Sequence, residues 1–277
     1  MSSIQKRWSG YNPVANLILI ATCVLIFYPF VALIVMSVKD TPQFMHHPWT
    51  VTFPLHLENY TKAFGAIVGY LVNSFFVSGV SVAAVLAFSS FTAYVLSRFE
   101  FPGREIIYYT IISLMMVPGL LTLVPQFMLV KEMGLLNSPW ALILPYIAGG
   151  QVIGIFLLRT FFLTTPKELY EAAQIDGAND FWAFFNVALP LAKPVLGIVA
   201  IMNVTGTWND LLWPLVAISE DRYRTITIGL AFFRGEYYTQ WGPLFAGYVL
   251  AAVPLIALFA FTARYFVEGM VSGALKS

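Results

Sequence analysis

The chain has 277 residues, of which 59% are hydrophobic and 10% are charged, and its formal net charge is +1. Soluble domains carry roughly a quarter charged residues, so this composition predicts an integral membrane protein. The near-neutral charge argues against a nucleic-acid-binding protein with a basic surface, and the single cysteine, Cys23, excludes an internal disulfide.

Six apolar runs are long enough to cross about 30 Å of hydrocarbon as helices. Lys6 and Arg7 precede the first run, as in a signal peptide, but that run is too long for a cleavable core and lacks a small-x-small cleavage site. We therefore expect it to remain as a first span. The sequence predicts an all-α membrane protein with six transmembrane helices, near residues 14–38, 68–97, 106–130, 140–163, 191–215 and 243–267.

The distribution of Lys and Arg predicts the orientation. Nine of these residues fall on the side that carries the N-terminus and six fall on the other side. Cytoplasmic segments carry the excess of basic residues, most strongly close to the spans. Since an even number of spans places both ends on one side, we expect both termini inside the cell.

All three histidines, His46, His47 and His56, lie in the first predicted outside loop, residues 39–67. A closed metal site needs three or four ligands, and these histidines have no cysteine or carboxylate cluster beside them. We therefore expect a packed outside loop and no metal site.

Small residues recur at four-residue spacing in two spans. They are Gly79, Ala83 and Ala87 in the second span, and Gly150 and Gly154 in the fourth. This spacing lets helices approach closely in lipid. It predicts packing and carries no information on chemistry.

The third predicted span is interrupted by Pro118, Gly119 and Pro125, and Gln126 follows. A proline inside a helix removes a hydrogen bond and clashes with the preceding turn. Such breaks occur where protein or a water-filled cavity satisfies the freed carbonyls. The pattern fits a helix that lines a transport pathway, and it fits equally a simple kink in a packed helix.

The fifth span holds the strongest polar signal, because Asn203, Gly206, Thr207 and Asp210 fall on one helix face. An aspartate inside a span costs about 3 kcal/mol on insertion scales, so it should face a cavity or a partner group. Asn203 and Thr207 are candidates for a path taken by a polar, uncharged solute, with Trp208 as a stacking surface beside Asn209. Asp210 could belong to this path or brace the helix before Pro214.

A polar interruption over residues 165–190 predicts two short helices. Thr165 and Glu168 match a capping box, with Pro166 in the first turn. Gly177 is typical of a helix stop, since the left-handed conformation is favourable only for glycine. The helix between them should place four residues on one shallow face: Leu169, Ala172, Ala173 and Asp176.

The second helix should begin at Asn179 or Asp180 as cap, and Pro190 and Pro194 then open the fifth span. One side of this helix should carry three aromatic residues and an alanine, namely Phe181, Phe184, Phe185 and Ala188. Such an aromatic side is suited to the headgroup boundary of the membrane. Two capped helices joined directly to two spans indicate a rigid connection through which a partner protein can move the spans.

This segment resembles the EAA signature of ATP-binding-cassette importer permeases. The match consists of Glu171-Ala172-Ala173, Asp176-Gly177-Ala178, Phe184, Leu189-Pro190 and Pro194 at the family spacing. Further similarity to the carbohydrate branch, the maltose and glycerol-phosphate type, lies in Asn73-Ser74, in Trp208-Asn209-Asp210 through Trp213-Pro214, and in 264–269. The resemblance covers about residue 14 to the end.

The resemblance implies a type I ABC importer permease fold. It divides the chain into residues 1–67 with the first span, a permease core over 68–265 with coupling helices at about 166–188, and a cytoplasmic tail over 266–277. It implies docking of the coupling helices on a cytoplasmic ATPase through Glu171, Ala172, Ala173, Asp176 and Gly177. The candidates for a substrate pathway are Asn73, Gln126, Asn203, Thr207, Trp208, Asn209 and Asp210.

The resemblance also implies the partners, which are a second homologous permease, two ATPase subunits and an extracytoplasmic sugar-binding protein. The chain has no G-x-x-x-x-G-K-[ST] motif, so ATP and Mg²⁺ should bind to the ATPase subunits alone. It has no H-E-x-x-H motif and no nucleophile elbow either, so we expect no catalytic centre.

The sequence therefore predicts a multi-pass permease in the bacterial cell membrane that imports a di- or oligosaccharide. One alternative is a permease for another solute, such as an osmolyte or a glycerol-phosphate-like compound. A second alternative is a membrane-embedded enzyme that acts on lipids, which would need a catalytic cluster at one interface.

Overall fold

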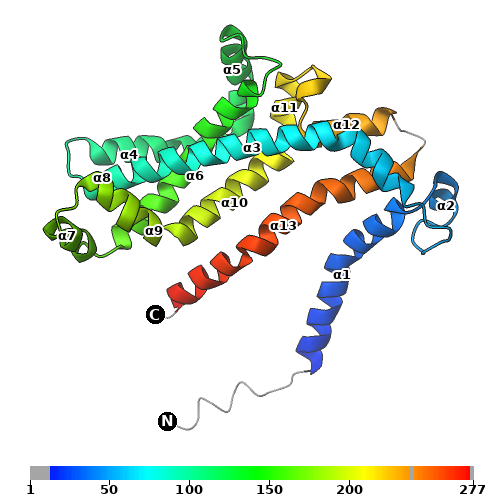
Figure 1. The fold of residues 1–277 in the computed structure, drawn as a ribbon, viewed down its shortest axis with the longest axis horizontal. Helices are drawn as coiled ribbons and strands as arrows, with labels where there is room; N and C mark the ends of the chain where they lie inside the picture. The colour runs from blue at the N-terminus through cyan, green and yellow to red at the C-terminus, as the bar shows by residue number, and fades with distance from the viewer. Residues whose placement is uncertain (1–12, 237–239, 275–277) are drawn as a thin grey trace. The chain divides into compact units, whose positions relative to one another are not determined.

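The structure is a computed structural model that describes the backbone of residues 13–236 and 240–274, and the side chains of 13–232 and 240–262. Every regular element within these ranges is a helix (Figure 1). The chain forms two compact units, one of Met1–Ala66 with Phe233–Leu250, the other of Ile67–Phe232 with Ala251–Ser277. Helices α3 (Glu58–Arg98), α12 (Ile226–Glu236) and α13 (Trp241–Ala274) each contribute to both units.

The first unit contains α1 (Pro13–Ser37), α2 (Thr41–His46) and the start of α3. Asp40 caps α2 in a capping box with Gln43. Lys39 is fully buried, and its ammonium donates hydrogen bonds to the backbone carbonyls of His47, Pro48 and Thr50. The predicted loop 39–67 is therefore packed and shorter than expected, because α2 lies within it and α3 begins at Glu58.

The second unit contains the remaining helices of the described chain. Its elements are the rest of α3, α4 (Arg104–Ser113), η2 (Leu114–Met116), α5 (Gly119–Glu132), α6 (Trp140–Thr164), α7 (Glu168–Ile175), α8 (Asp180–Ala183), η3 (Phe184–Ala188), α9 (Leu189–Leu191), α10 (Lys193–Asn209), α11 (Leu212–Ala217), η4 (Asp221–Tyr223), the start of α12 and the end of α13. Figure 1 shows α10 running beside α6, and the Asn203 side chain of α10 packs against Gly150 of α6.

Four helices in the described part of the chain are long and apolar enough to cross a membrane, namely α1, α3, α6 and α13 up to Thr262. Two bent pairs bring the number to six if each pair is one span. One pair is Arg104–Met116 with Gly119–Glu132, bent by 104°, and the other is Asp180–Leu191 with Lys193–Asn209, bent by 74°. The predicted count of six thus depends on two broken spans.

Two predicted spans differ in detail from the structure. The third, 106–130, is broken at Pro118, whose extended backbone (ψ 128°) separates η2 from α5, whereas Pro125 stays inside α5. The fifth, 191–215, ends as a helix at Asn209, because Asp210 adopts an extended conformation before α11 begins. Pro118 therefore interrupts the first of these two apolar runs, and Asp210 interrupts the second.

Small residues allow close packing at only some of the predicted positions. A Cβ atom at Gly150 would collide with the Asn203 side chain of α10, and one at Gly154 would lie 2.7 Å from the Ser89 Oγ of α3. This confirms the prediction for the fourth span. Gly79 has no described atom within 4 Å of a Cβ position, so its small size serves no contact within the described chain.

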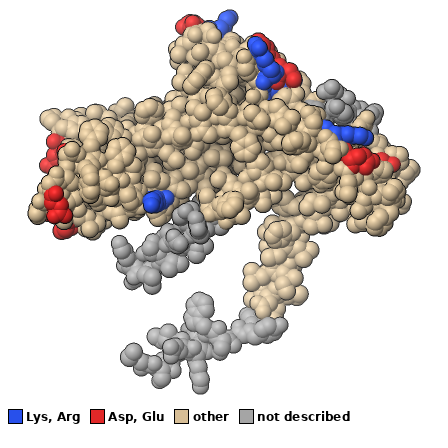
Figure 2. Space-filling model, in the orientation of Figure 1, with Lys and Arg blue, Asp and Glu red and all other residues tan. Residues whose placement is uncertain are grey.

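Charged side chains are sparse on the face drawn in Figure 2, where they form small groups separated by wide uncharged areas. Many apolar side chains are also exposed, including Leu25 on α1 and Leu120 on α5. A soluble protein rarely exposes so much apolar surface, whereas lipid or a partner chain can cover it.

Candidate functional site

The candidate site is the pair of short helices α7 and α8 with the turn between them. Helix α7 begins after Lys167, whose side chain makes no capping bond. Thr165 instead ends α6, and its hydroxyl donates to the Phe161 carbonyl at 3.2 Å. The predicted capping box of Thr165 with Glu168 is therefore wrong, because the last turn of α6 already uses this hydroxyl.

The end of α7 confirms the predicted stop at Gly177. This glycine has φ +86°, a conformation that strains any residue with a side chain. Its N–H donates to the Gln174 carbonyl at 3.0 Å, and the Ala178 N–H donates to the Ala173 carbonyl at 2.9 Å. These two bonds are a Schellman motif, which fixes the direction in which the chain leaves α7.

A hollow of about 630 Å³ lies against the predicted docking face. Ala172, Asp176 and Gly177 are exposed there, while Ala173 is buried and Glu171 lies outside the hollow. Because most of these side chains are small, the backbone of another protein can approach closely. The lining residues are Leu169, Ala172, Ala173, Asp176, Gly177, Ala178, Asn179, Trp182 and Val187.

Helix α8 starts at Asn179, whose side-chain oxygen accepts a hydrogen bond from the Trp182 N–H at 2.8 Å. Of the two possible caps, the structure therefore selects Asn179. The next segment, η3, is a π-helix, a form that is rare and often found at functional sites.

The aromatic residues expected on one side of the second short helix differ in burial. Phe184 and Ala188 are buried in the core, whereas Phe181 and Phe185 are exposed. Phe181 and Phe184 nevertheless both pack on Phe91, and the rings of Phe184 and Phe185 lie 4.9 Å apart, so the aromatic residues are neighbours that differ in depth.

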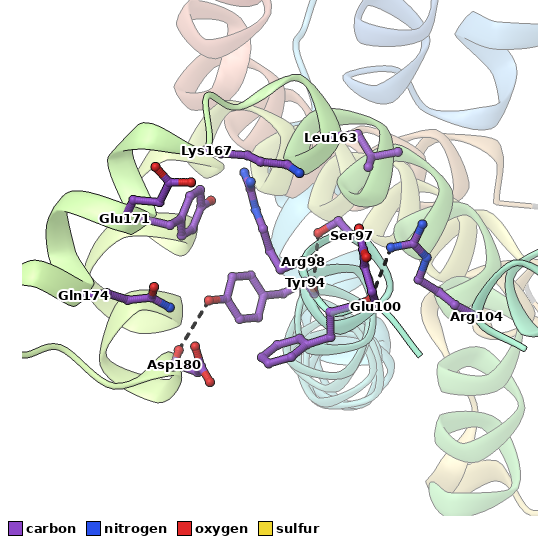
Figure 3. A pocket seen from close by; sticks show the side chains of 12 residues that line it. Tyr94, Ser97, Arg98, Glu100, Arg104, Leu163, Lys167, Glu171, Gln174 and Asp180 are labelled. Carbon is purple, nitrogen blue, oxygen red and sulfur yellow. Dashed lines mark hydrogen bonds between the residues drawn. The ribbon is translucent and has the colours of Figure 1, made fainter. Parts of the chain in front are cut away.

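Arg98, at the end of α3, joins three helices beside a pocket of about 470 Å³ (Figure 3). Its guanidinium donates to the carbonyls of Phe162 (2.8 Å) and Thr165 (3.0 Å) at the end of α6. The same group lies 3.7 Å from the ring centroid of Tyr170 in α7, a cation–π contact. Arg98 therefore contacts the ends of α3 and α6 and the ring of Tyr170 in α7 at once.

Tyr94 makes a second connection, since its hydroxyl donates to the Asp180 carbonyl at 3.4 Å, as the dashed line in Figure 3 shows. The sequence analysis did not include Tyr94, Arg98 or Tyr170 among the site residues. A basic residue at the end of an apolar span was the only available signal, and it pointed to orientation alone.

The predicted pathway residues of α10 bond largely to the protein itself. Thr207 is buried and donates to the Ser78 hydroxyl of α3 at 2.8 Å. The side-chain amides of Asn203 and Asn209 donate to the carbonyls of Val199 and Thr205 one turn earlier. Trp208 is buried edge-on against Phe75.

Asp210 has the geometry of a brace. Its carboxylate accepts hydrogen bonds from the Leu212 N–H (3.1 Å) at the start of α11 and from the Tyr146 hydroxyl (2.9 Å) of α6, and so joins these two helices. This is the second of the two roles that the sequence left open for Asp210.

The other two pathway candidates lie elsewhere. Gln126 lines an apolar hollow of about 820 Å³ between α5 and α6. Asn73 donates to the carbonyls of Arg222 (2.8 Å) and Arg224 (2.9 Å) and so holds the segment before α12. The structure does not gather the seven candidates around one cavity, and their contact with a substrate stays a prediction.

The predicted cytoplasmic tail covers residues 266–277, whose side chains lie outside the described part of the structure. The described backbone of α13 continues as a helix to Ala274. The role of the tail stays a prediction.

The chain matches the family model described as "Binding-protein-dependent transport system inner membrane component" over residues 86–272. It is 35% identical to "Probable ABC transporter permease protein YurM" of Bacillus subtilis (strain 168), over 98% of this chain and 91% of the relative. It is 34% identical to "Diacetylchitobiose uptake system permease protein NgcG" of Streptomyces coelicolor, over 99% and 91%.

A solved structure shares the fold. It is titled as a bacterial ABC transporter involved in the import of the acidic polysaccharide alginate. Its matching chain has a TM-score of 0.80 and 22% sequence identity, with 91% of this chain and 95% of that chain covered. At this identity the likeness concerns the arrangement of helices.

Proposed function

Since the chain belongs to the family of binding-protein-dependent transport system inner membrane components, we propose that it carries a di- or oligosaccharide across the membrane. It is a multi-pass membrane permease without catalytic activity of its own. Relatives at 34% identity are named as permeases for diacetylchitobiose and for arabinooligosaccharides, which supports this substrate class.

The energy for transport comes, in this proposal, from two cytoplasmic ATPase subunits that bind ATP and Mg²⁺. The docking face is the hollow beside α7, with Ala172, Ala173, Asp176 and Gly177, and Glu171 on the adjoining surface of the helix. The observation that carries the proposal is the fixed turn at Gly177, which holds two short helices rigidly beside this shallow hollow.

A second homologous permease would complete the pathway, and an extracytoplasmic binding protein would deliver the sugar. ATP-driven movement of α7 would reach the spans through Arg98 and Tyr94, which tie α7 and α8 to α3 and α6. The spans would then move between two states, with ATP favouring one of them by its higher affinity for that state.

Uptake into proteoliposomes tests this function. The complete complex is supplied with ATP inside and with the saturated binding protein outside, and accumulation of radiolabelled solutes is measured. We expect uptake of a di- or oligosaccharide, and no uptake of an osmolyte or a glycerol phosphate. Uptake of either control solute in place of sugars would contradict the proposed substrate class, and uptake without ATP would contradict the proposed energy source.

A further inference from the structure

The polar pocket beside Arg98 is separate from the hollow proposed as the docking face. Its volume is about 470 Å³, and residues of α3, α6, α7 and α8 line it (Figure 3). Sites for small molecules have volumes of about 300–1,000 Å³, so this pocket is large enough to hold a small ligand.

Helix α7 presents opposite faces to the pocket and to the hollow. Tyr170 and Gln174 line the pocket, whereas Ala173 and Asp176 line the hollow. With about 3.6 residues per turn, the two sets lie on opposite sides of the helix. A ligand in the pocket would therefore touch α7 and leave the hollow open.

Two buried polar atoms at the pocket have no partner. Tyr170 is only 7% exposed, and its hydroxyl makes no hydrogen bond within the described part of the chain. The Nε atom of Arg98 is likewise buried and unpartnered among the described residues. Because buried polar groups almost always have a hydrogen-bond partner, these two atoms point to a molecule that binds here.

The lining indicates the chemistry of this molecule. It offers basic and acidic side chains in equal number, namely Arg98, Arg104 and Lys167 with Glu100, Glu171 and Asp180. This balance disfavours a strongly charged ligand. Hydroxyl groups both donate and accept, so a polyhydroxylated molecule can pair with cationic and carboxylate groups at once. Phe99 adds an aromatic ring to the lining and is 37% exposed. A neutral carbohydrate, with hydroxyl groups and apolar C–H faces, matches both features.

We propose that the pocket binds a neutral di- or oligosaccharide on the cytoplasmic side and that this binding slows import. The inference rests on the proposed function, which brings sugar to the side of the membrane where α7 lies. Figure 3 shows Gln174 of α7 and Glu100, which follows α3, on opposite sides of the pocket. A sugar bonded to both would hold α7 at the end of α3. ATP could then move α7 only by breaking these bonds, so bound sugar favours the resting state.

Inhibition by internal sugar tests this site in proteoliposomes. The complete complex receives ATP inside and saturated binding protein outside, and the lumen is preloaded with increasing concentrations of the sugar that enters empty vesicles. The initial rate of radiolabelled uptake is measured relative to each protein's own rate with an empty lumen. Gln174→Leu and Glu100→Leu each remove a polar group from one side of the pocket. We expect the internal concentration that halves the rate to rise about fivefold in each variant, the effect of one lost hydrogen bond.

Glu168→Leu is the matched control, because Glu168 is an exposed residue of α7 that lines neither the pocket nor the hollow. It should keep the wild-type value. Uptake by the wild type that is indifferent to internal sugar would overturn the proposal and would indicate that an ATPase or a lipid headgroup fills the pocket. Equal inhibition of all four proteins would also refute it, because the sugar would then act from the transport path. A lack of sugar uptake into empty vesicles would refute the proposed function and this inference together.

Discussion

Single residues fix the geometry of the segment from α7 to α8, and Gly177 does so through its backbone. Only glycine occupies φ +86° without strain, and a residue with a side chain there costs about 1–3 kcal/mol. No described atom lies within 4 Å of a Cβ at this position, so the strain is conformational and not steric.

Gly177→Val should therefore distort the turn and uncouple ATP hydrolysis from transport. In the reconstituted complex we expect sugar uptake to fall several-fold while basal hydrolysis persists. Gly69→Val is the matched control, because Gly69 lies in α3 with open space beside it and an ordinary helical backbone. Wild-type uptake per ATP in Gly177→Val would show that the turn is unimportant for coupling.

Substitutions at Asp210 distinguish a residue that joins two helices from a residue that contacts the substrate. The two donors use different carboxylate oxygens, so Asp210→Asn can keep an oxygen for the Leu212 N–H while its NH2 group donates to the Tyr146 hydroxyl oxygen, whereas Asp210→Ala leaves both groups without this partner. We expect Asp210→Ala to lose about 1–2 kcal/mol of stability and Asp210→Asn to lose much less. Thermal unfolding in detergent measures the difference. If Asp210→Asn kept its stability but lost sugar uptake, the carboxylate would act on the pathway.

At the scale of elements, Arg98 couples α3, α6 and α7. Hydrogen bonds from a charged group contribute about 1.5–3 kcal/mol, and this guanidinium makes two, with the Tyr170 ring against its face.

Arg98→Met should lower the unfolding temperature and weaken the stimulation of ATP hydrolysis by the binding protein. Lys131→Gln, which removes an exposed charge at the end of α5, should change neither. A variant Arg98→Met that is less stable yet fully coupled would assign Arg98 to stability alone.

The elements also show what the sequence could predict. Long apolar runs located α1, α3, α6 and α13. The preference of glycine for the left-handed conformation located the end of α7 at Gly177. The bend at Pro118 was ambiguous, because a proline can kink a helix or end it, and tertiary contacts decide. The predicted capping box is absent because the Thr165 hydroxyl donates to the last turn of α6 and α7 begins after Lys167. The contacts of Arg98 join segments more than sixty residues apart, so local patterns could not reveal them.

At the scale of the whole molecule, the spans should alternate across the membrane with both termini inside. In a Cys23→Ser background, we expect a membrane-impermeant maleimide to label Glu132→Cys in intact cells. Glu100→Cys should react only in inverted vesicles. Both positions are exposed, so access depends on the side of the membrane. The opposite pattern would reverse the predicted orientation.

The discontinuous make-up of the first unit has a consequence for synthesis. Its parts, Met1–Ala66 and Phe233–Leu250, are separated by 166 residues, and Gly242 packs directly on the Lys39 carbonyl and the Asn59 side chain. A ribosome that adds 5–20 residues per second needs on the order of ten to thirty seconds to make the intervening chain. During that interval the first unit is incomplete. The insertion machinery or the lipid must cover its exposed groups until Phe233–Leu250 has been synthesised.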